Sequence, residues 1–365
     1  MSAELPTLRW GIIATGLISS WFVEDLVLER SDAKAKHIVQ AVGSSSVEKG
    51  KAFVEKHLAG HNPTVYGSYT DVYSDPDVDI VYIGTPHAFH KQNALDAINA
   101  GKHVLCEKAF TITAKEARDV FDAAKQKGVF VMEAMWTRFF PLTRSLVNVL
   151  HTEKHIGDVH RVFCDFAMNM DLASLGPDSR LKNPALGAGS LLDIGIYSLT
   201  FAVLGLDPAV GEAGVKPKIA ATQTLSEDID IATSALLLYP DGKQGVLTSS
   251  TQVKTPPVFC RIEGSKGYVL VEGIATSVPG SFTVHSSEAS SQGWRESSTE
   301  GLRAKTFSFE RPGRGFYWEA DAVAVDIAAG RKESAVMPWA ETIRVMEIMD
   351  EIRRQGGAKF PQDDQ

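Results

Sequence analysis

Three side chains that can handle protons stand out in the sequence. Asp193 and Tyr197 lie four residues apart, just after Gly189, and on a helix that spacing places both side chains on one face. Lys108 comes shortly after the apolar run Val104–Leu105, where a buried parallel strand would deliver its side chain into a cleft. Together these residues predict a Tyr/Lys site that handles a proton beside a bound cofactor.

Such a pair suits the oxidation of an alcohol. When a hydride leaves a carbinol carbon, the hydroxyl proton must leave as well, and a general base takes it best when its pKa is near the working pH. A free phenol titrates near about 10, and an adjacent ammonium and an oxidised nicotinamide both stabilise the tyrosinate. The ammonium can also donate a hydrogen bond to the substrate oxygen. Taken alone, Tyr197 also suits a half-buried core phenol, and Lys108 a solvated lysine at a strand end.

Size and charge narrow the class of protein. The chain has 365 residues, 44% of them hydrophobic, which predicts two domains because a single core usually stops growing near about 250 to 300 residues. The net charge is -8, without a Lys/Arg block, so small-molecule chemistry is favoured over nucleic-acid binding. No apolar run approaches the about 18 residues of a membrane span, and no signal-peptide pattern is present, so we expect a cytosolic protein.

Cysteines and histidines give no sign of a disulfide frame or a metal site. The three cysteines are scattered, which predicts free buried thiols. His57 and His61, like His151 and His155, have the spacing of zinc ligands, but neither pair is accompanied by enough further ligands. We therefore expect no bound metal.

The first third of the chain alternates between strand and helix patterns. The expected strands are Leu8–Ala14, His37–Gly43, Ile80–Ile83, His103–Cys106 and Val129–Met132. Helices are expected between them, including about Lys91 to Ala100 and Ala114–Lys127, which end at Gly101 and Gly128. This alternation predicts an α/β domain over residues 1–138, with a doubly wound parallel Rossmann sheet.

Residues 139–365 have a different pattern of strand and helix signals, which predicts an α+β domain. Turn dipeptides such as Asp241–Gly242 favour hairpins and an open, mainly antiparallel sheet. The expected strands are His160–Met168, Ile231–Tyr239, Lys243–Gln252, Val258–Glu263 and Tyr268–Glu272. The serine-rich stretch Ser277–Ser298, around Trp294, predicts an irregular loop or loose hairpin. The expected helices are Leu142 to about Leu150, Tyr317–Ala329 and Ala340–Gln355.

The turn after the first strand predicts a dinucleotide phosphate site. It is a degraded G-x-G-x-x-G in which Gly16 keeps the middle position, and the predicted contacts are Ala14, Thr15, Gly16, Leu17 and Ile18. After the second strand, hydroxyls and a cation replace the acidic residue typical of NAD sites: Ser44, Ser45, Ser46 and Lys49. These groups suit a 2′-phosphate, so NADP is favoured. The alternatives are a strand-to-helix turn without a ligand and a solvated helix cap.

Seven segments spread along the chain together resemble the Gfo/Idh/MocA oxidoreductase family. They are Leu8–Ser20, Thr85–His90, Cys106–Phe110, Met132–Phe140, Leu192–Tyr197, Gly315–Ala320 and Met337–Trp339. Within the family the chain is most similar to the branch of dimeric dihydrodiol dehydrogenases and fungal NADP-dependent D-xylose 1-dehydrogenases. Tyr197, where many members carry histidine, is typical of this branch. Ala109, where most members carry proline, points to the fungal enzymes.

The resemblance implies a function for the residues singled out above. Lys108 and Tyr197 become the catalytic pair, with Asp193 orienting the substrate or the lysine. The implied reaction is NADP-dependent oxidation of a cyclic aldose, above all D-xylose, at C1 to the lactone, in a homodimer formed through the open sheet. One alternative is the oxidation of trans-dihydrodiols. Another is a non-catalytic NADP-binding regulator of transcription, against which the retained pair argues.

Further residues are predicted around this site. Thr85, Pro86, His87 and His90 end the third paired strand and are expected at the nicotinamide half of the cofactor, with turn chemistry as the alternative. Trp136, Arg138 and Phe139 are expected to wall the sugar site, or else to pack at a domain hinge. Arg180 and Asn183 are candidate ligands of substrate hydroxyls, unless they are simply solvated. Glu107 either contacts the cofactor or serves as a structural partner.

Overall fold

The computed structural model describes residues 4–286 and 303–364, and the chain divides into two compact units. Unit 1 comprises Met1–Phe139 together with Arg311–Ile343. Unit 2 comprises Phe140–Glu310 together with Arg344–Gln365. Each unit has its own sheet.

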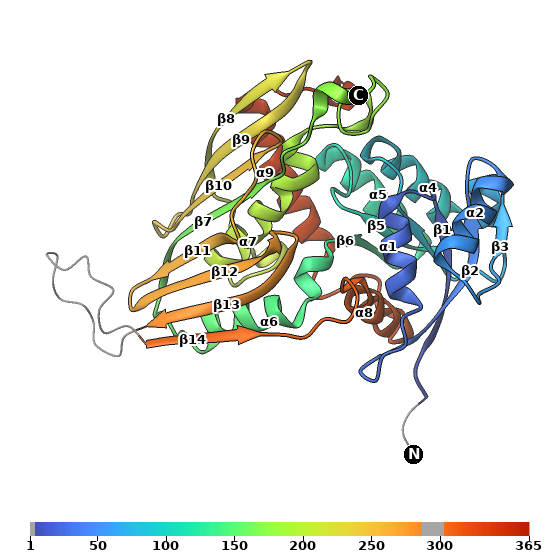
Figure 1. Ribbon diagram of the computed structural model, residues 1–365, viewed down its shortest axis with the longest axis horizontal. Helices are drawn as coiled ribbons and strands as arrows, with labels where there is room; N and C mark the ends of the chain where they lie inside the picture. Colours follow the sequence, from blue (N-terminus) through green and yellow to red (C-terminus); the bar gives the residue numbers. More distant parts are fainter. Residues whose placement is uncertain (1–3, 287–302, 365) are drawn as a thin grey trace, which may run out of the picture. The chain divides into compact units, whose positions relative to one another are not determined.

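Unit 1 contains a six-stranded parallel sheet in the order β3-β2-β1-β4-β5-β6 (Figure 1). This is the strand order of the doubly wound dinucleotide-binding fold, so the predicted Rossmann sheet is confirmed. Its strands are β1 (Thr7–Ile13), β2 (Lys36–Gly43), β3 (Thr64–Tyr66), β4 (Ile80–Ile83), β5 (His103–Glu107) and β6 (Val131–Ala134). Its helices include α1 (Leu17–Leu26), α2 (Val47–His57), α3 (Tyr69–Ser74), α4 (His90–Asn99), α5 (Ala114–Lys127) and α8 (Phe316–Ala328).

Two helices of unit 1 end where glycine was expected to stop them. Gly128 follows α5 with a φ of 67°, and Gly101 follows α4 after one further residue with a φ of 80°. Only glycine adopts this left-handed backbone without a steric cost, which is why both helices end there.

The chain returns to unit 1 after it has built most of unit 2, and the expected boundary at residues 138 and 139 did not foresee this. Asp25, on α1, accepts hydrogen bonds from the backbone N–H groups of Arg314 at 3.0 Å, Gly315 at 2.6 Å and Phe316 at 2.9 Å. The first N–H groups of a helix have no partner within it, so this carboxylate caps α8 from α1. Residues 311–343, predicted as part of the second domain, are therefore held by the first.

Unit 2 contains an eight-stranded sheet in the order β14-β13-β12-β11-β7-β10-β9-β8. All neighbouring strands are antiparallel except β7 and β10, which confirms the mainly antiparallel sheet. The strands are β7 (Val159–Ala167), β8 (Lys218–Ser226), β9 (Ile229–Leu238), β10 (Gln244–Ser250), β11 (Val258–Gly264), β12 (Gly267–Ala275), β13 (Val278–Ser286) and β14 (Arg303–Ser308). The helices include α6 (Pro141–Val147) and α7 (Ile196–Leu206), and α9 (Trp339–Gly356) starts in unit 1 and continues in unit 2.

Helix α7 packs across β7, β10 and β11 on one face of this sheet, and Figure 1 draws no helix over its other face among the described residues. The serine-rich stretch, predicted as an irregular loop or loose hairpin, begins as a strand: Val278–Ser286 form β13, which pairs antiparallel with β12 and β14. Trp294 and its neighbours lie outside the described residues. The edge strands β8 and β14 were not expected from the sequence, because most of their side chains are exposed and polar.

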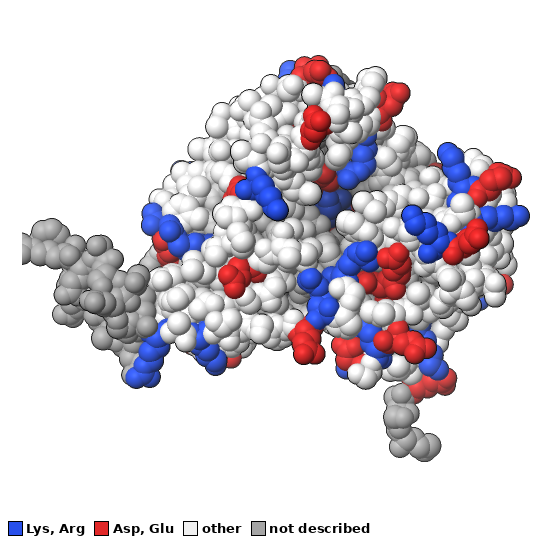
Figure 2. Space-filling model, in the orientation of Figure 1, with Lys and Arg blue, Asp and Glu red and all other residues white. Residues whose placement is uncertain are grey.

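Among the residues that the structure describes, one stretch is long and apolar enough to cross a membrane, contrary to the expectation that none would be. Pro184–Leu206 has a mean hydropathy of 1.6. However, 94% of its apolar window is buried inside the protein, as in a core helix. On the face of the molecule in Figure 2, basic and acidic side chains are interspersed, and no broad area carries a single sign.

Candidate active site

The loop between β1 and α1 has open space beside Gly16. Ala14 takes a left-handed backbone with a φ of 70°, and Gly16 caps α1, whose first turn carries no acidic residue. A Cβ built on Gly16 would meet no atom within 4 Å. Packing within the protein therefore does not require glycine here, whereas close approach of a phosphate to the helix N-terminus does. Leu17, 67% exposed, and the partly exposed Ile18 follow in the first turn.

The loops after β1 and β2 meet beside this space. Thr15 Oγ1 and Ser44 Oγ are 3.1 Å apart. Ser46 Oγ accepts a hydrogen bond from the Lys49 backbone N–H at 3.3 Å and caps α2, so the helix-cap alternative holds for Ser46. The Lys49 ammonium donates to Ser45 Oγ at 3.1 Å, and both residues are exposed. An ammonium and a hydroxyl thus lie together at a helix N-terminus, which favours an anion.

His90 connects the loop after β4 with the loop after β5. Its side chain is buried, with Nε2 at 2.7 Å from the Thr85 carbonyl and Nδ1 at 2.9 Å from the Ala109 carbonyl. Burial lowers the pKa of this histidine. Because both ring nitrogens are engaged with backbone, His90 is a structural link rather than the cofactor contact that was predicted. His87 packs beside it, with the two rings 5.6 Å apart.

Thr85 is also held through its side chain, because the Asn93 amide donates to Thr85 Oγ1 at 3.0 Å. Asn93 was missed in the sequence, where it is one more polar residue on α4. Thr85, Pro86 and His87 lie at the carboxyl end of β4, the edge at which such sheets bind ligands. Their contact with the nicotinamide half stays a prediction.

The segment around Lys108 is fixed from both sides. Glu107, the last residue of β5, accepts a hydrogen bond from the buried Tyr82 hydroxyl at 2.7 Å, so it has a structural partner. Phe110, two residues after Lys108, donates its backbone N–H to Glu133 Oε1 at 3.1 Å. Lys108 is therefore carried by a short, well-braced turn at the carboxyl edge of the sheet.

The aromatic and basic residues after β6 are buried within unit 1. Arg138 is 2% exposed and forms an ion pair at 2.5 Å with Glu341, which is fully buried. The prediction that Arg138 walls a sugar site is therefore wrong: its guanidinium is engaged in the core. Trp136 stacks on Phe316, with ring centroids 4.0 Å apart, and Phe139 is buried as well. Packing explains these two rings, and a substrate contact for them stays a prediction.

In unit 2, Asp193 and Tyr197 share one helical segment, as predicted. The segment starts with a π-helical turn, Leu191–Gly195, and continues as α7. Wider turns of this kind occur frequently at functional sites. Tyr197 is 5% exposed, and its ring lies edge-on to Phe166 with centroids 5.7 Å apart.

Arg180 and Asp193 were predicted separately, and the structure brings them together. An Arg180 guanidinium nitrogen lies 3.3 Å from Asp193 Oδ1, at the exposed side of the helix start. Asn183 instead accepts a hydrogen bond from the Ala185 N–H at 2.9 Å and caps a short turn. A local structural role therefore accounts for Asn183 Oδ1, and a contact of this side chain with substrate stays a prediction.

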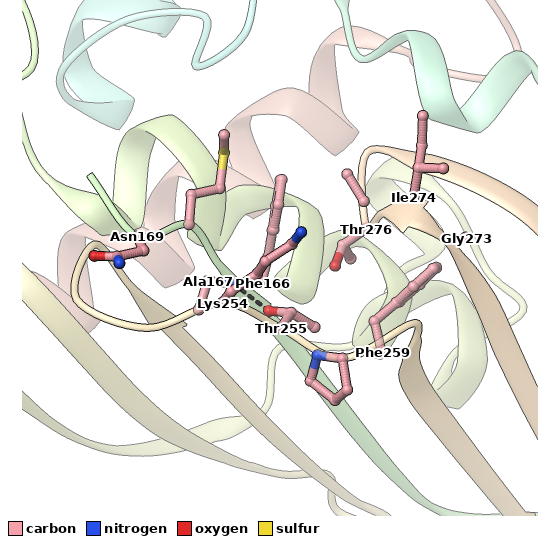
Figure 3. Close-up of a pocket in the computed structure, with 12 residues that line it drawn as sticks. Phe166, Ala167, Asn169, Lys254, Thr255, Phe259, Gly273, Ile274 and Thr276 are labelled. Carbon is pink, nitrogen blue, oxygen red and sulfur yellow. Dashed lines mark hydrogen bonds between the residues drawn. The ribbon is translucent and has the colours of Figure 1, made fainter. Parts of the chain in front are cut away.

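A pocket of about 240 Å³ is lined in part by Phe166, whose ring lies edge-on to that of Tyr197. Figure 3 shows Phe166, Phe259 and Ile274 contributing apolar surface, with Thr255 beside Ala167. Phe166 was missed in the sequence, since an apolar residue in an alternating strand is expected only in the core. In the part of the chain that the structure describes, all cysteines are free and buried, and no three His, Cys, Asp or Glu gather as metal ligands would.

Comparison with known proteins relates both units to one family. Residues 8–135 match the oxidoreductase family with an NAD-binding Rossmann fold, and residues 147–270 match the GFO/IDH/MocA C-terminal domain. A D-xylose 1-dehydrogenase (NADP(+)) of Hypocrea jecorina is 35% identical over 98% of this chain and 94% of its own length. A trans-1,2-dihydrobenzene-1,2-diol dehydrogenase of Bos taurus is 35% identical over 98% of this chain and 99% of its own length.

Solved structures share the fold at lower identity. An aldose-aldose oxidoreductase from Caulobacter crescentus superposes with a TM-score of 0.77 at 24% identity, over 96% of this chain and 98% of that one. A 3-ketoreductase from Actinomadura kijaniata, solved with NADP, gives 0.76 at 21% identity over the same shares. The expectation of an enzyme with a nicotinamide-dinucleotide cofactor is thereby confirmed: the chain belongs to the Gfo/Idh/MocA family of oxidoreductases.

Proposed function

We propose that this oxidoreductase oxidises a cyclic aldose, D-xylose, at C1 to the lactone, with NADP as the hydride acceptor. The observation that carries the proposal is the likeness to a D-xylose 1-dehydrogenase (NADP(+)), 35% identical over 98% of the chain. Two features of the backbone support it. Hydrogen bonds at Glu107 and Phe110 hold the turn that carries Lys108, and Tyr197 follows a buried π-helical turn at the start of α7.

The chain's own residues account for the proton. The chemistry that a bound nicotinamide would supply is acceptance of the hydride from C1 of the sugar. Tyr197 Oη removes the proton of the C1 hydroxyl, so the C1–O bond becomes the carbonyl of the lactone. The Lys108 ammonium donates a hydrogen bond to the same oxygen and stabilises its developing charge. Asp193, held by Arg180, orients the sugar or the lysine.

The preference for NADP over NAD is supported by the groups after β2. Lys49 and Ser45 lie within hydrogen-bonding distance of each other and are exposed at the N-terminus of α2. An ammonium, a hydroxyl and a helix N-terminus together favour a 2′-phosphate. A ribose hydroxyl would instead favour a carboxylate acceptor at this place.

A second candidate is the oxidation of trans-dihydrodiols. The bovine dihydrodiol dehydrogenase matches this chain at the same 35% identity and over slightly more of its own length. The chemistry at the two carbinols is the same, so Tyr197 and Lys108 would serve either substrate.

We also propose that the chain forms a homodimer through the face of the unit 2 sheet opposite α7. The register places Leu236, Val246, Phe163, Arg261 and Leu270 in one row across five strands. The Arg261 guanidinium lies 4.6 Å above the Phe163 ring, and Leu236 is 37% exposed. Such a row of apolar and arginine side chains is typical of an interface. Sedimentation of wild type and Leu236→Glu tests this, with a dimer that becomes a monomer as the expected result.

The experiment that tests the function follows NADPH absorbance with a panel of pentoses, hexoses and a cyclohexane diol. We expect D-xylose to be oxidised fastest, and Tyr197→Phe to lose about 100-fold or more of the rate, because a general base contributes at least that much. Tyr268→Phe is the matched control, since Tyr268 stacks on His285 elsewhere in unit 2. Preference for the diol supports the second candidate. A Tyr197→Phe enzyme as fast as wild type rules out the proposed base.

A further inference from the structure

Asp230 is a buried carboxylate on β9 whose hydrogen bonds reach the start of the segment that carries Asp193 and Tyr197. Its Oδ2 atom accepts from Ser190 Oγ at 2.7 Å and from the Leu191 backbone N–H at 2.7 Å. Its side chain is fully buried. The first N–H groups of a helix lack partners within the helix, and a negative charge there also interacts favourably with the helix dipole.

The surroundings of Asp230 leave little freedom for the helix start. A Cβ on Gly189 would lie 2.2 Å from Asp230 Oδ1, and Gly189 has a φ of 139°, so only glycine fits. Ser190 Oγ lies 3.0 Å from Ser249 Oγ on β10. A Cβ on Gly195 would lie 2.9 Å from that same Ser249 oxygen. The π-helical turn is thus packed against β9 and β10 at its start and against β10 at its end.

The Asp230 carboxylate also accepts a hydrogen bond from a residue on its own strand, β9. Thr233 Oγ1 donates to the same Asp230 oxygen at 2.9 Å, and Gln223 on β8 donates to Thr233 Oγ1 at 3.0 Å. Hydrogen bonds to a charged acceptor are stronger than those between neutral groups. Asp230 therefore joins the helix start to two strands of the sheet.

We propose that Asp230 is a positioning residue for Tyr197. Its carboxylate fixes Leu191, and the one π-helical turn that follows sets the place from which Tyr197 Oη meets the substrate hydroxyl. The inference rests on the proposed function of Tyr197. A misplacement of about 1 Å at a reacting group can cost about 100-fold in rate, so a small shift of this turn affects the chemical step.

The test is a double-mutant cycle of Asp230→Asn with Tyr197→Phe. We expect Asp230→Asn to lower kcat about 10-fold with the KM for NADP unchanged, because the turn shifts by less than 1 Å. In the Tyr197→Phe background the same substitution is expected to cost less than about twofold, since residues that act through one another are not additive. A purely structural role would give the same loss in both backgrounds.

Asp207→Asn is the matched control. Asp207 follows the other end of α7, is buried, and accepts from Arg344 at 2.6 Å. This variant is expected to lower thermal stability while kcat of the folded enzyme stays within about twofold, because the N-terminal turn is untouched. If Asp230→Asn does not fold, Ser190→Ala removes one donor and keeps the carboxylate. We then expect about a threefold loss of kcat and the same non-additivity.

Three results overturn the inference: wild-type kcat for Asp230→Asn, an equal loss in the Tyr197→Phe background, or an equal loss for Asp207→Asn. The outcome for the proposed function is read separately from Tyr197→Phe alone. If that variant is as fast as wild type, the proposed base is wrong and the inference falls with it. If it is slow while Asp230→Asn is normal, only the inference is wrong.

Discussion

Glu133 gives the protein a pH-dependent stability whose size follows from the structure. It is a buried carboxyl on β6, and its Oε1 atom holds the backbone N–H of Phe110, two residues after Lys108. Burial raises the pKa of Glu133 from 4.5 to about 7. In the unfolded chain the same group ionises near 4.5, so between these values the native state binds more protons than the unfolded state.

The sign and the magnitude follow from this difference. The stabilising contribution of Glu133 is complete below about pH 4.5 and is lost as the pH rises through about 7. A shift of this size corresponds to about 3 kcal/mol in the free energy of unfolding. Glu133→Gln keeps the shape of the side chain and removes the titration. Relative to wild type, the variant is therefore expected to gain stability as the pH rises.

Thermal unfolding followed by circular dichroism tests this. Between about pH 5 and pH 8, the difference between Glu133→Gln and wild type should move about 2.5 kcal/mol toward the variant, or about 3 °C in Tm if the chain unfolds in one transition. Glu55→Gln, at an exposed position on α2, serves as the control for the same exchange of side chains outside the core. Parallel Tm curves for wild type and Glu133→Gln would refute the reasoning.

Three further predictions concern other parts of the structure. Arg138→Met removes the guanidinium that pairs with the buried Glu341, so the free energy of unfolding is expected to fall by about 3 to 5 kcal/mol while the KM for the sugar stays unchanged. Unchanged stability together with a raised KM would instead mean that Arg138 contacts the substrate. Asp25→Ala leaves three N–H groups at the start of α8 without an acceptor, and denaturant unfolding should show a loss of about 3 kcal/mol; a loss below about 1 kcal/mol would contradict the cap. Lys49→Ala should raise the KM for NADP about 10-fold and leave that for NAD unchanged, since only the phosphate needs the charge; an unaltered ratio of the two would place the phosphate elsewhere.

The sheet of unit 1 could be predicted because its signals are local. The strands other than β3 contain short apolar runs, and Gly101 and Gly128 mark helix ends through their own backbone conformation. The three-residue strand β3 was too short to give such a signal. The attachment of α8 to unit 1 could not be foreseen either, because Asp25 and the N–H groups it caps are about 290 residues apart in the chain.

The candidate site could also be predicted only in part, again according to whether the signal was local. Lys108, Asp193 and Tyr197 could be proposed as site residues because their types and spacing carry chemistry. Arg180 and Asp193 were proposed separately, and only the structure shows that their side chains meet. Arg138 was misjudged because its partner, Glu341, lies 203 residues away. Asp230 gave no signal at all, since it stands just before the expected strand Ile231–Tyr239, and only the fold shows that it lies on β9 and is buried.

The central claim is that Lys108 and Tyr197 act on one carbinol, and a crystal structure of the complex with NADP and D-xylose tests it most directly. We expect the C1 hydroxyl oxygen of the sugar within about 3.2 Å of both the Lys108 Nζ and the Tyr197 Oη atoms. A sugar seated with C1 over the nicotinamide, but with either atom more than about 5 Å from that oxygen, would contradict the claim.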